Sequence, residues 1–320
     1  MTPVALAAAR IRRLHRLAGP DGIVAGIALD HRDSFRTVLG RAGIDGVSDD
    51  DIRRLKLAIG RCLAPAASAV MIDAELGSMV LETAAIPPAV GVIVPLEAQG
   101  YETQGDRRLT SLLDDLTPAD ALAIGADACK LLLPYRVDDV EAADAQDALL
   151  RSTVTACHAV GLPLVVEPVV HRRSDETAEA HAAAYPSLVI DAVARLQPLG
   201  ADLLKLPFPA LDSGRRAADP AGDARTADAC RTLALACGDT PWVLLGGGAD
   251  LDTYVGQIRA AGAAGASGFL AGRGIWGPVL RADPAESARL AGDIARPAFE
   301  RCRDAARAAC RPLAPPPGVA

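Results

Sequence analysis

The sequence predicts a (β/α)8 barrel that forms a single domain. Short apolar runs alternate with longer amphipathic stretches along the chain, which is typical of parallel strands covered by helices on both faces. Eight such runs occur within 320 residues, which matches the strand number of this barrel. An open, doubly wound parallel sheet is the alternative. Against it, Leu29-Asp30-His31-Arg32 follows the first run, where a dinucleotide-binding sheet would have its G-x-G-x-x-G turn.

Each expected strand is a continuous apolar block of about 4–8 residues. The blocks are residues 23–29, 69–73, 90–95, 128–133, 164–170, 202–207, 242–245 and 268–271. Helical patterns lie between them at 51–64, 140–160, 178–196, 224–237 and 251–261, with a weak one at 78–85. The expected caps or first-turn acids are Asp51, Asp139, Asp223 and Asp250, and the expected stops are Gly161 and Gly262. Residues 97–111 are expected to form a long loop.

No composition shift, repeat or low-complexity block divides the chain, so we expect one domain over residues 1–311. Residues 312–320 are rich in proline and are expected to be a disordered tail. We also expect the protein to form a homo-oligomer.

The composition argues for a cytoplasmic protein without membrane or nucleic-acid partners. A formal net charge of −7 and only 3% aromatic residues are unfavourable for nucleic-acid binding. No run of 18 apolar residues is present for a transmembrane helix, and residues 1–16 lack the apolar segment of a signal peptide. The seven cysteines form no C-x-x-C pair, which fits a reducing cytosol.

Lysine is rare in this chain, because only three of the 33 basic residues are lysines: Lys56, Lys130 and Lys205. Arginine serves where charge alone matters, whereas a desolvated lysine can lose its proton and act as a nucleophile. Lys130 and Lys205 lie inside apolar runs, where a charge is costly unless it is paired or functional. Lys56 lies on a predicted surface helix and is expected to be solvated or salt-bridged.

The strand ends predict a cluster of Lys130, Glu167 and Lys205. In a barrel the active site lies at the carboxyl ends of the strands, and these residues belong to three neighbouring strands with inward-pointing positions. A carboxylate would then lie between two ammonium groups. We expect the neighbouring charge and desolvation to lower the pKa of one lysine, while the carboxylate carries protons. A purely structural ion-pair cluster is the alternative.

Other polar residues at strand ends are candidates for substrate contacts. Asp30, His31 and Arg32 follow the first strand, Asp73 ends the second, and Arg172 follows the fifth. Arg172 could meet an anionic end of the substrate or belong to a solvated loop.

The last two strands end in glycine-rich turns that predict an anion site. Gly246, Gly247 and Gly248 follow the seventh strand, and Gly272 and Arg273 follow the eighth. Backbone N–H groups at bare glycines can approach a phosphate, and an arginine can bind it with two hydrogen bonds. The loops after strands seven and eight are a recurring phosphate site in these barrels.

No motif predicts a metal or an organic cofactor. The histidines show no H-x-H or H-E-x-x-H spacing, and G-x-S-x-G and Walker sequences are absent. We therefore expect chemistry without a metal or cofactor.

Several of these motifs, taken in order, resemble a known family. They are residues 26–32, 70–73, 130–133, 166–170, 200–205, 241–245 and 264–273. Together they are similar to the class I aldolases that include tagatose 1,6-bisphosphate aldolase and 6-deoxy-6-sulfofructose 1-phosphate aldolase. Residues 166–170 and 265–273 are nearer the sulfofructose-phosphate branch.

The resemblance implies a barrel that cleaves a sugar phosphate without a metal. It implies a Schiff-base lysine at Lys205, accessory groups at Asp30, Lys130 and Glu167, and phosphate binding by Arg273. It also implies a ketose 1-phosphate as substrate, with dihydroxyacetone phosphate and an aldehyde as products.

The resemblance leaves more than one ketose open. We place 6-deoxy-6-sulfofructose 1-phosphate first, with sulfolactaldehyde as its aldehyde product, and tagatose or fructose 1,6-bisphosphate second. The sequence departs from the family pattern at His31 (usually Gln), at Gly246 and Gly247 (usually a serine-containing turn) and at Pro207 (often Glu).

Two other functions remain open at this point. One is a catalytically silent barrel that binds a sugar phosphate as a sensor or scaffold. The other is a phosphosugar isomerase that uses Glu167 as a base without an imine.

Overall fold

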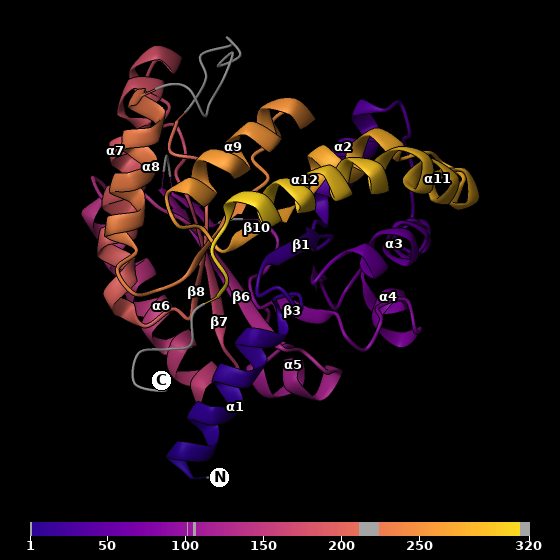
Figure 1. The fold of residues 1–320 in the computed structure, drawn as a ribbon, viewed down its shortest axis with the longest axis horizontal. Coiled ribbons are helices and arrows are strands. Elements are labelled where there is room, and N and C mark those ends of the chain that lie inside the picture. Colours follow the sequence, from indigo (N-terminus) through magenta and orange to yellow (C-terminus); the bar gives the residue numbers. More distant parts are fainter. Residues whose placement is uncertain (1, 101, 105–106, 211–223, 314–320) are drawn as a thin grey trace.

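Eight parallel strands close into a barrel within the residues that the computed structural model describes, which are 2–100, 102–104, 107–210 and 224–313 (Figure 1). Around the barrel the strands follow the order β1-β2-β3-β6-β7-β8-β9-β10. They are β1 (Val24–Ala28), β2 (Ala69–Met71), β3 (Gly91–Pro95), β6 (Ala128–Pro134), β7 (Leu164–Val169), β8 (Leu203–Leu206), β9 (Trp242–Leu245) and β10 (Gly268–Ala271). The predicted barrel is confirmed, and the open-sheet alternative is wrong.

Helices surround the barrel on its outer face (Figure 1). The α-helices are α1 (Pro3–Arg16), α2 (Asp33–Arg41), α3 (Asp49–Leu63), α4 (Ser78–Glu82), α5 (Pro118–Ile124), α6 (Val140–Ala159), α7 (Ala178–Leu196), α8 (Ala224–Ala236), α9 (Leu251–Ala263), α10 (Arg273–Trp276), α11 (Pro284–Leu290) and α12 (Arg296–Ala309). Short helical turns are η1 (Ala64–Ala66), η2 (Gln197–Leu199), η3 (Gly277–Val279) and η4 (Ala291–Ala295). No helix in this described part of the chain is long and apolar enough to cross a membrane.

Most of the expected helix signals act as predicted. Asp139 and Asp250 cap α6 and α9 by accepting backbone N–H bonds. Asp51 is instead the third residue of α3, in a capping box with Ser48. Gly161 follows α6 with a positive φ of 72°. Asp223 lies outside the described residues.

The expected stop at Gly262 is wrong, because α9 continues to Ala263. A Cβ atom at Gly262 would lie 2.7 Å from the carbonyl carbon of Ala309. Glycine is therefore needed here for the close approach of α12, and not for a turn.

The expected long loop at residues 97–111 is also wrong in part. It contains a short antiparallel pair, β4 (Glu102–Gln104) and β5 (Arg107–Leu109). Glu97 forms an antiparallel bridge with Leu112 at the base of this pair. The segment is too polar to show the alternation of apolar and polar residues from which a strand is predicted. The pairing of β4 with β5 therefore could not be predicted from an apolar pattern.

The amino end of the barrel is closed by apolar side chains. Leu14 and Leu17 of the α1 region pack with Leu313 against the apolar residues that point into the barrel. Leu313 is only 5% exposed, and its N–H donates to the carbonyl of Gly22. The expected boundary at residue 312 is therefore too early, while residues 314–320 lie outside the described part. With this end filled, the carboxyl ends of the strands form the open end of the described barrel.

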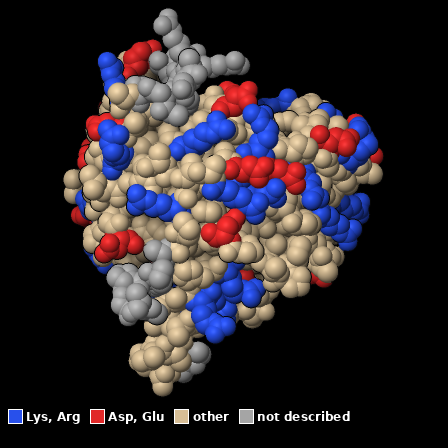
Figure 2. All heavy atoms as spheres, in the orientation of Figure 1, with Lys and Arg blue, Asp and Glu red and all other residues tan. Residues whose placement is uncertain are grey.

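One outer face of the protein carries interspersed charges of both signs (Figure 2). This is the face that α12 crosses in Figure 1. Arginines of α12 pair with acids across it: Arg296 Nε lies 3.2 Å from Glu300 Oε1, Arg301 Nη2 2.8 Å from Asp252 Oδ1 and Arg307 Nε 2.7 Å from Asp21 Oδ2.

We predict that Gly268→Ala prevents the barrel from closing. Gly268 has a φ of 140°, and a Cβ there would lie 1.8 Å from the carbonyl oxygen of Val24, in the strand that pairs with β10. Gly43→Ala is a matched control, because Gly43 also has a positive φ of 74° but no atom within 4 Å of the added Cβ. The control should lose about 1–2 kcal/mol of unfolding free energy. Gly268→Ala should lose more than 4 kcal/mol or fail to fold. Equal losses in urea denaturation would contradict this account.

Candidate active site

Lys130 lies at the centre of a group of buried charges at the mouth of the barrel. Its Nζ is 3.1 Å from Asp30 Oδ2 and 3.3 Å from Glu167 Oε2, and it donates a hydrogen bond to Glu97 Oε1. Asp30 and Glu97 each stand two residues after a strand, β1 and β3, whereas Lys130 and Glu167 lie within β6 and β7. The structure thus gathers one cation and three carboxylates from four strands. With Lys205 we call these five residues the lysine–carboxylate centre.

Lys205 is the second lysine of the centre and has fewer partners. Its Nζ donates to Glu167 Oε2 at 2.9 Å and lies 3.9 Å from the sulfur of Met71. Glu167 therefore lies between two ammonium groups, as the strand positions predict. Lys205 is 5% exposed and lines a cavity of about 780 Å³ that opens at the carboxyl ends of the strands.

The charges of the centre shift the pKa values of its members. Burial favours the neutral form of Lys130, but Glu97, Asp30 and Glu167 outweigh burial and raise its pKa well above the usual value. Burial likewise opposes ionisation of Asp30 and Glu167, and the two lysines overcome it, so the pKa of each carboxyl is lowered. Lys130 is therefore not the lysine with the lowered pKa that we expected, because Asp30 and Glu97 face it as well as Glu167.

Glu97 belongs to the centre but was not among the residues predicted from the sequence. Burial raises the pKa of its carboxyl, although Lys130 partly offsets this effect. Its second oxygen accepts the backbone N–H of Leu132 at 3.3 Å. The feature of the sequence that could have identified Glu97 is its position two residues beyond a strand end, which is also the position of Asp30. It was missed because we assigned it to a long loop.

His31 lines the cavity beside Asp30 and packs edge-on against Trp276, with ring centroids 5.2 Å apart. Burial lowers the pKa of its imidazole to about 4, while Asp30 opposes this and Arg273 adds to it. The imidazole is therefore neutral at pH 7. It can act as a hydrogen-bond donor or acceptor toward a substrate, but not as a positive group.

Arg32 and Arg172 do not serve as free cations for a substrate. Arg32 is buried at the wall of the cavity, where it pairs with Glu75 and donates to the carbonyl of Glu97 at 2.7 Å. Arg172 is exposed, is not among the residues that line the cavity, and donates to the carbonyl of Glu176 at 2.7 Å. The solvated-loop alternative for Arg172 is the better description.

Asp73 also lies outside the cavity, because it forms a buried ion pair with Lys56. Lys56 has no exposed surface, and its Nζ lies 5.8 Å from the ring centre of Phe35. The expected salt bridge of Lys56 is present, but its expected place at the surface is wrong. Burial lowers the pKa of Lys56 even though Asp73 opposes this. The pair holds the loop after β2, where Asp73 Oδ1 also accepts the N–H of Leu76 at 2.6 Å.

The structure divides the predicted anion site into two parts. Gly247, Gly248 and Arg273 line the large cavity, and both glycines have positive φ values, 47° and 81°. The N–H of Gly248 donates to the carbonyl of Gly246 within the turn, so it is already used. Arg273 is exposed and has the only guanidinium of the predicted anion site.

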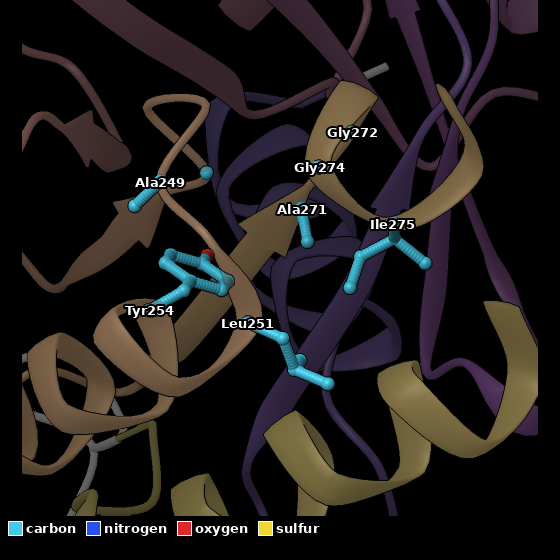
Figure 3. A pocket seen from close by; sticks show the side chains of 8 residues that line it. Ala249, Leu251, Tyr254, Ala271, Gly272, Gly274 and Ile275 are labelled. Atoms are coloured by element: carbon cyan, nitrogen blue, oxygen red, sulfur yellow. The ribbon is translucent and has the colours of Figure 1, made fainter. Parts of the chain in front are cut away.

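Gly246 and Gly272 instead line a small void of about 10 Å³ behind the glycine turn. Figure 3 shows Tyr254 and Ile275 on its two sides, with Ala271 at the end of β10 between them. The close approach of His31 explains the glycine at 272, because a Cβ there would lie 2.9 Å from His31 Cε1. In the part of the chain described, no three or more His, Cys, Asp or Glu side chains are arranged to hold a metal ion.

Fold and site together define a class of protein, a parallel α/β barrel with buried lysines and carboxylates at the carboxyl ends of its strands. A sequence profile of the DeoC/LacD family aldolases matches residues 25–277, and the chain belongs to this family of class I aldolases.

Relatives within the family are tagatose aldolases. Tagatose 1,6-diphosphate aldolase 1 from Enterococcus faecalis is 30% identical over 203 residues, which cover 62% of this chain and 61% of the relative. Tagatose 1,6-diphosphate aldolase from Listeria monocytogenes serotype 4a is 26% identical over 278 residues, covering 82% and 80%. These relatives favour the tagatose branch over the sulfofructose-phosphate branch that we placed nearer.

Solved structures of other aldolases share the fold. Fructose-bisphosphate aldolase from Plasmodium falciparum superimposes with a TM-score of 0.69 at 14% identity, over 96% of each chain. An archaeal fructose-1,6-bisphosphate aldolase, with its catalytic lysine bound to a carbinolamine intermediate, gives 0.56 at 17% identity, over 90% of this chain and 99% of that one.

We predict that His31 makes folding stability depend on pH between its two pKa values. Its pKa is about 4 in the folded state and about 6.5 in an unfolded chain. As pH falls through this window, the unfolded state takes up a proton that the folded state excludes, so stability decreases. In urea denaturation across this window, His31→Gln should show a shallower decrease than the wild type. If the unfolding free energies of the wild type and of His31→Gln decreased equally across this window, the His31 imidazole would be protonated in the folded protein as readily as in the unfolded chain.

Proposed function

We propose that this protein cleaves a ketose 1-phosphate by a retro-aldol reaction through an imine on Lys205. The observation that carries the proposal is the unequal pairing of the two lysines. Lys130 is held as an ammonium ion by three carboxylates, whereas Lys205 contacts only Glu167 among them and faces the cavity. Lys205 is thus the lysine that can give up its proton and react.

The reaction begins when the neutral amine of Lys205 adds to the C2 carbonyl of the ketose. Its nitrogen forms a bond to C2 as the carbonyl π bond breaks, and a proton passes from the nitrogen to the oxygen, which gives a carbinolamine. Glu167 in its protonated form gives a proton to the hydroxyl group, which leaves as water, and an iminium ion results. Glu167, 2.9 Å from the amine in the free protein, then removes the C4 hydroxyl proton. The C3–C4 bond breaks, its electron pair forms the enamine, and the aldehyde leaves. Proton return to C3 and hydrolysis release the ketone.

Lys130 and Asp30 support this chemistry by binding the hydroxyl groups of the sugar. Both line the same cavity as Lys205, and their ionised forms are strongly favoured. Arg273 and the turn at Gly247 lie across the cavity as the C1 phosphate site. With the phosphate on C1, the released ketone is dihydroxyacetone phosphate.

Tagatose or fructose 1,6-bisphosphate is the substrate that the relatives favour. The names of the E. faecalis and L. monocytogenes relatives specify a tagatose diphosphate. Arg32 and Arg172 have other partners, so neither supports a sulfonate or a phosphate at the far end of the sugar. The bisphosphate is preferred because of the relatives.

A ketose 1-phosphate with an uncharged far end is a second candidate. Leu132, Val169 and Phe208 form an apolar part of the cavity wall. Among the described residues that line the cavity, Arg273 is the one guanidinium without a carboxylate partner. Such a wall suits a neutral end of a sugar better than a second phosphate.

Borohydride trapping tests the mechanism. Reduction in the presence of dihydroxyacetone phosphate should inactivate the protein and add the mass of the reduced adduct at Lys205. Lys56 and Lys130 serve as internal controls in the same peptide map and should remain unmodified. Lys205→Met should abolish trapping and turnover. Full turnover by this variant would exclude the imine, and ligand-induced thermal stabilisation without trapping or aldehyde release would favour the silent barrel.

The condensation reaction distinguishes the substrates. Dihydroxyacetone phosphate is offered with glyceraldehyde 3-phosphate, sulfolactaldehyde or neutral glyceraldehyde, and kcat/KM is measured for each. The bisphosphate proposal predicts the highest value for glyceraldehyde 3-phosphate. The highest value for neutral glyceraldehyde would favour the second candidate.

A further inference from the structure

We propose that Glu97 stores the proton that Lys205 releases when it becomes a nucleophile, and later returns it to Glu167 through Lys130. Glu97 acts through Lys130 and is therefore a positioning residue for proton transfer. This inference rests on the imine mechanism proposed above and adds to it the route of the proton.

The geometry provides a continuous route of polar contacts. Lys205 Nζ donates to Glu167 Oε2 at 2.9 Å, and the same oxygen lies 3.3 Å from Lys130 Nζ. Lys130 in turn donates to Glu97 Oε1. The four groups are each at most 7% exposed and lie at the wall of the cavity.

The surroundings of Glu97 make it the suitable end of this route. Lys130 from β6 faces its carboxylate, Asp30 and Glu167 share that lysine, and Arg32 donates to its backbone carbonyl. Asp30 cannot store a proton easily, because the charges of Lys130 and Lys205 keep it ionised despite burial. At Glu97 burial outweighs the attraction of Lys130 and raises the pKa, so Glu97 accepts a proton more readily than its neighbours.

A store separates the released proton from the reacting nitrogen. A proton that stays on Glu167 remains next to the amine, at a contact of 2.9 Å, and can return to it. Transfer to Glu97 leaves Lys205 as a free amine during the attack. The proton then returns to Glu167, which protonates the leaving hydroxyl and is ionised again for the C4 hydroxyl proton.

Lys205 gives a proton to Glu167, which gives one to Lys130 while Lys130 gives one of its own to Glu97. Lys205 is then a neutral amine, Glu97 is a carboxylic acid, and Glu167 and Lys130 keep their initial charges. The reverse transfer protonates Glu167, and its proton leaves with the hydroxyl group as water when the C2–O bond breaks.

Glu97→Gln tests this route, because the amide can still accept the hydrogen bond from Lys130 but cannot store a proton. We expect kcat in the cleavage direction to fall by about 10- to 100-fold, with KM changed by less than about threefold. The pH profile of kcat should move to higher pH, because Lys205 must then lose its proton to solvent. Glu97→Asp keeps a titratable carboxyl and should restore part of kcat and the wild-type profile.

Asp147→Asn is a matched control, since Asp147 is a buried acid that pairs with Tyr135 and Arg195 outside the cavity. It should leave the pH profile unchanged.

Wild-type kcat and pH profile in Glu97→Gln would overturn the inference. If Glu97→Gln does not fold, Glu97→Asp and Glu97→Asn provide the same comparison of a carboxylic acid with an amide. Equal pH profiles of kcat in these two variants would overturn the inference. Failure to trap Lys205 in the wild type would instead contradict the proposed function itself.

Discussion

The ammonium group of Lys130 holds together the mouth of this barrel. Three buried carboxylates would repel one another and lose their hydration without a cation among them. Asp30, Glu97 and Glu167 reach Lys130 from the ends of β1 and β3 and from β7. The same contacts leave Lys205 with a single carboxylate partner, Glu167. The difference between a permanently charged lysine and a reactive one therefore follows from how the carboxylates are shared.

A second group of ion pairs supports this centre from the outside. Arg32, Glu75 and the carbonyl of Glu97 join the loops after β1, β2 and β3, and Lys56 pairs with Asp73 behind them. These contacts explain why residues that look like substrate ligands in the sequence have structural partners instead. An arginine beside an active site has the same charge whether it binds substrate or orients a loop. Only the position of the nearest carboxylate distinguishes the two roles.

The opposite side of the cavity is shaped by backbone geometry more than by charge. Positive φ values at Gly247 and Gly248 curve the turn after β9 toward the cavity, and Gly272 leaves room for His31. Burial keeps the His31 imidazole neutral, so Arg273 supplies the positive charge that faces a phosphate on this side. Among the described residues that line the cavity, the two lysines and the three carboxylates of the centre lie on one wall, and Arg273 and Asp250 lie on the other.

The barrel could be predicted from the sequence because its strands are continuous apolar blocks, and the period of two placed Lys130, Glu167 and Lys205 on inward positions. The scarcity of lysine identified two of these residues without any structural information. The partners of Glu97, Arg32 and Asp73 depended on the tertiary structure alone. Each lies beyond a strand end, where no periodic pattern operates, and the path of each loop decides which opposite charge it meets. Sequence spacing determines which residues face the barrel interior, whereas barrel closure and loop geometry determine which buried charges are paired.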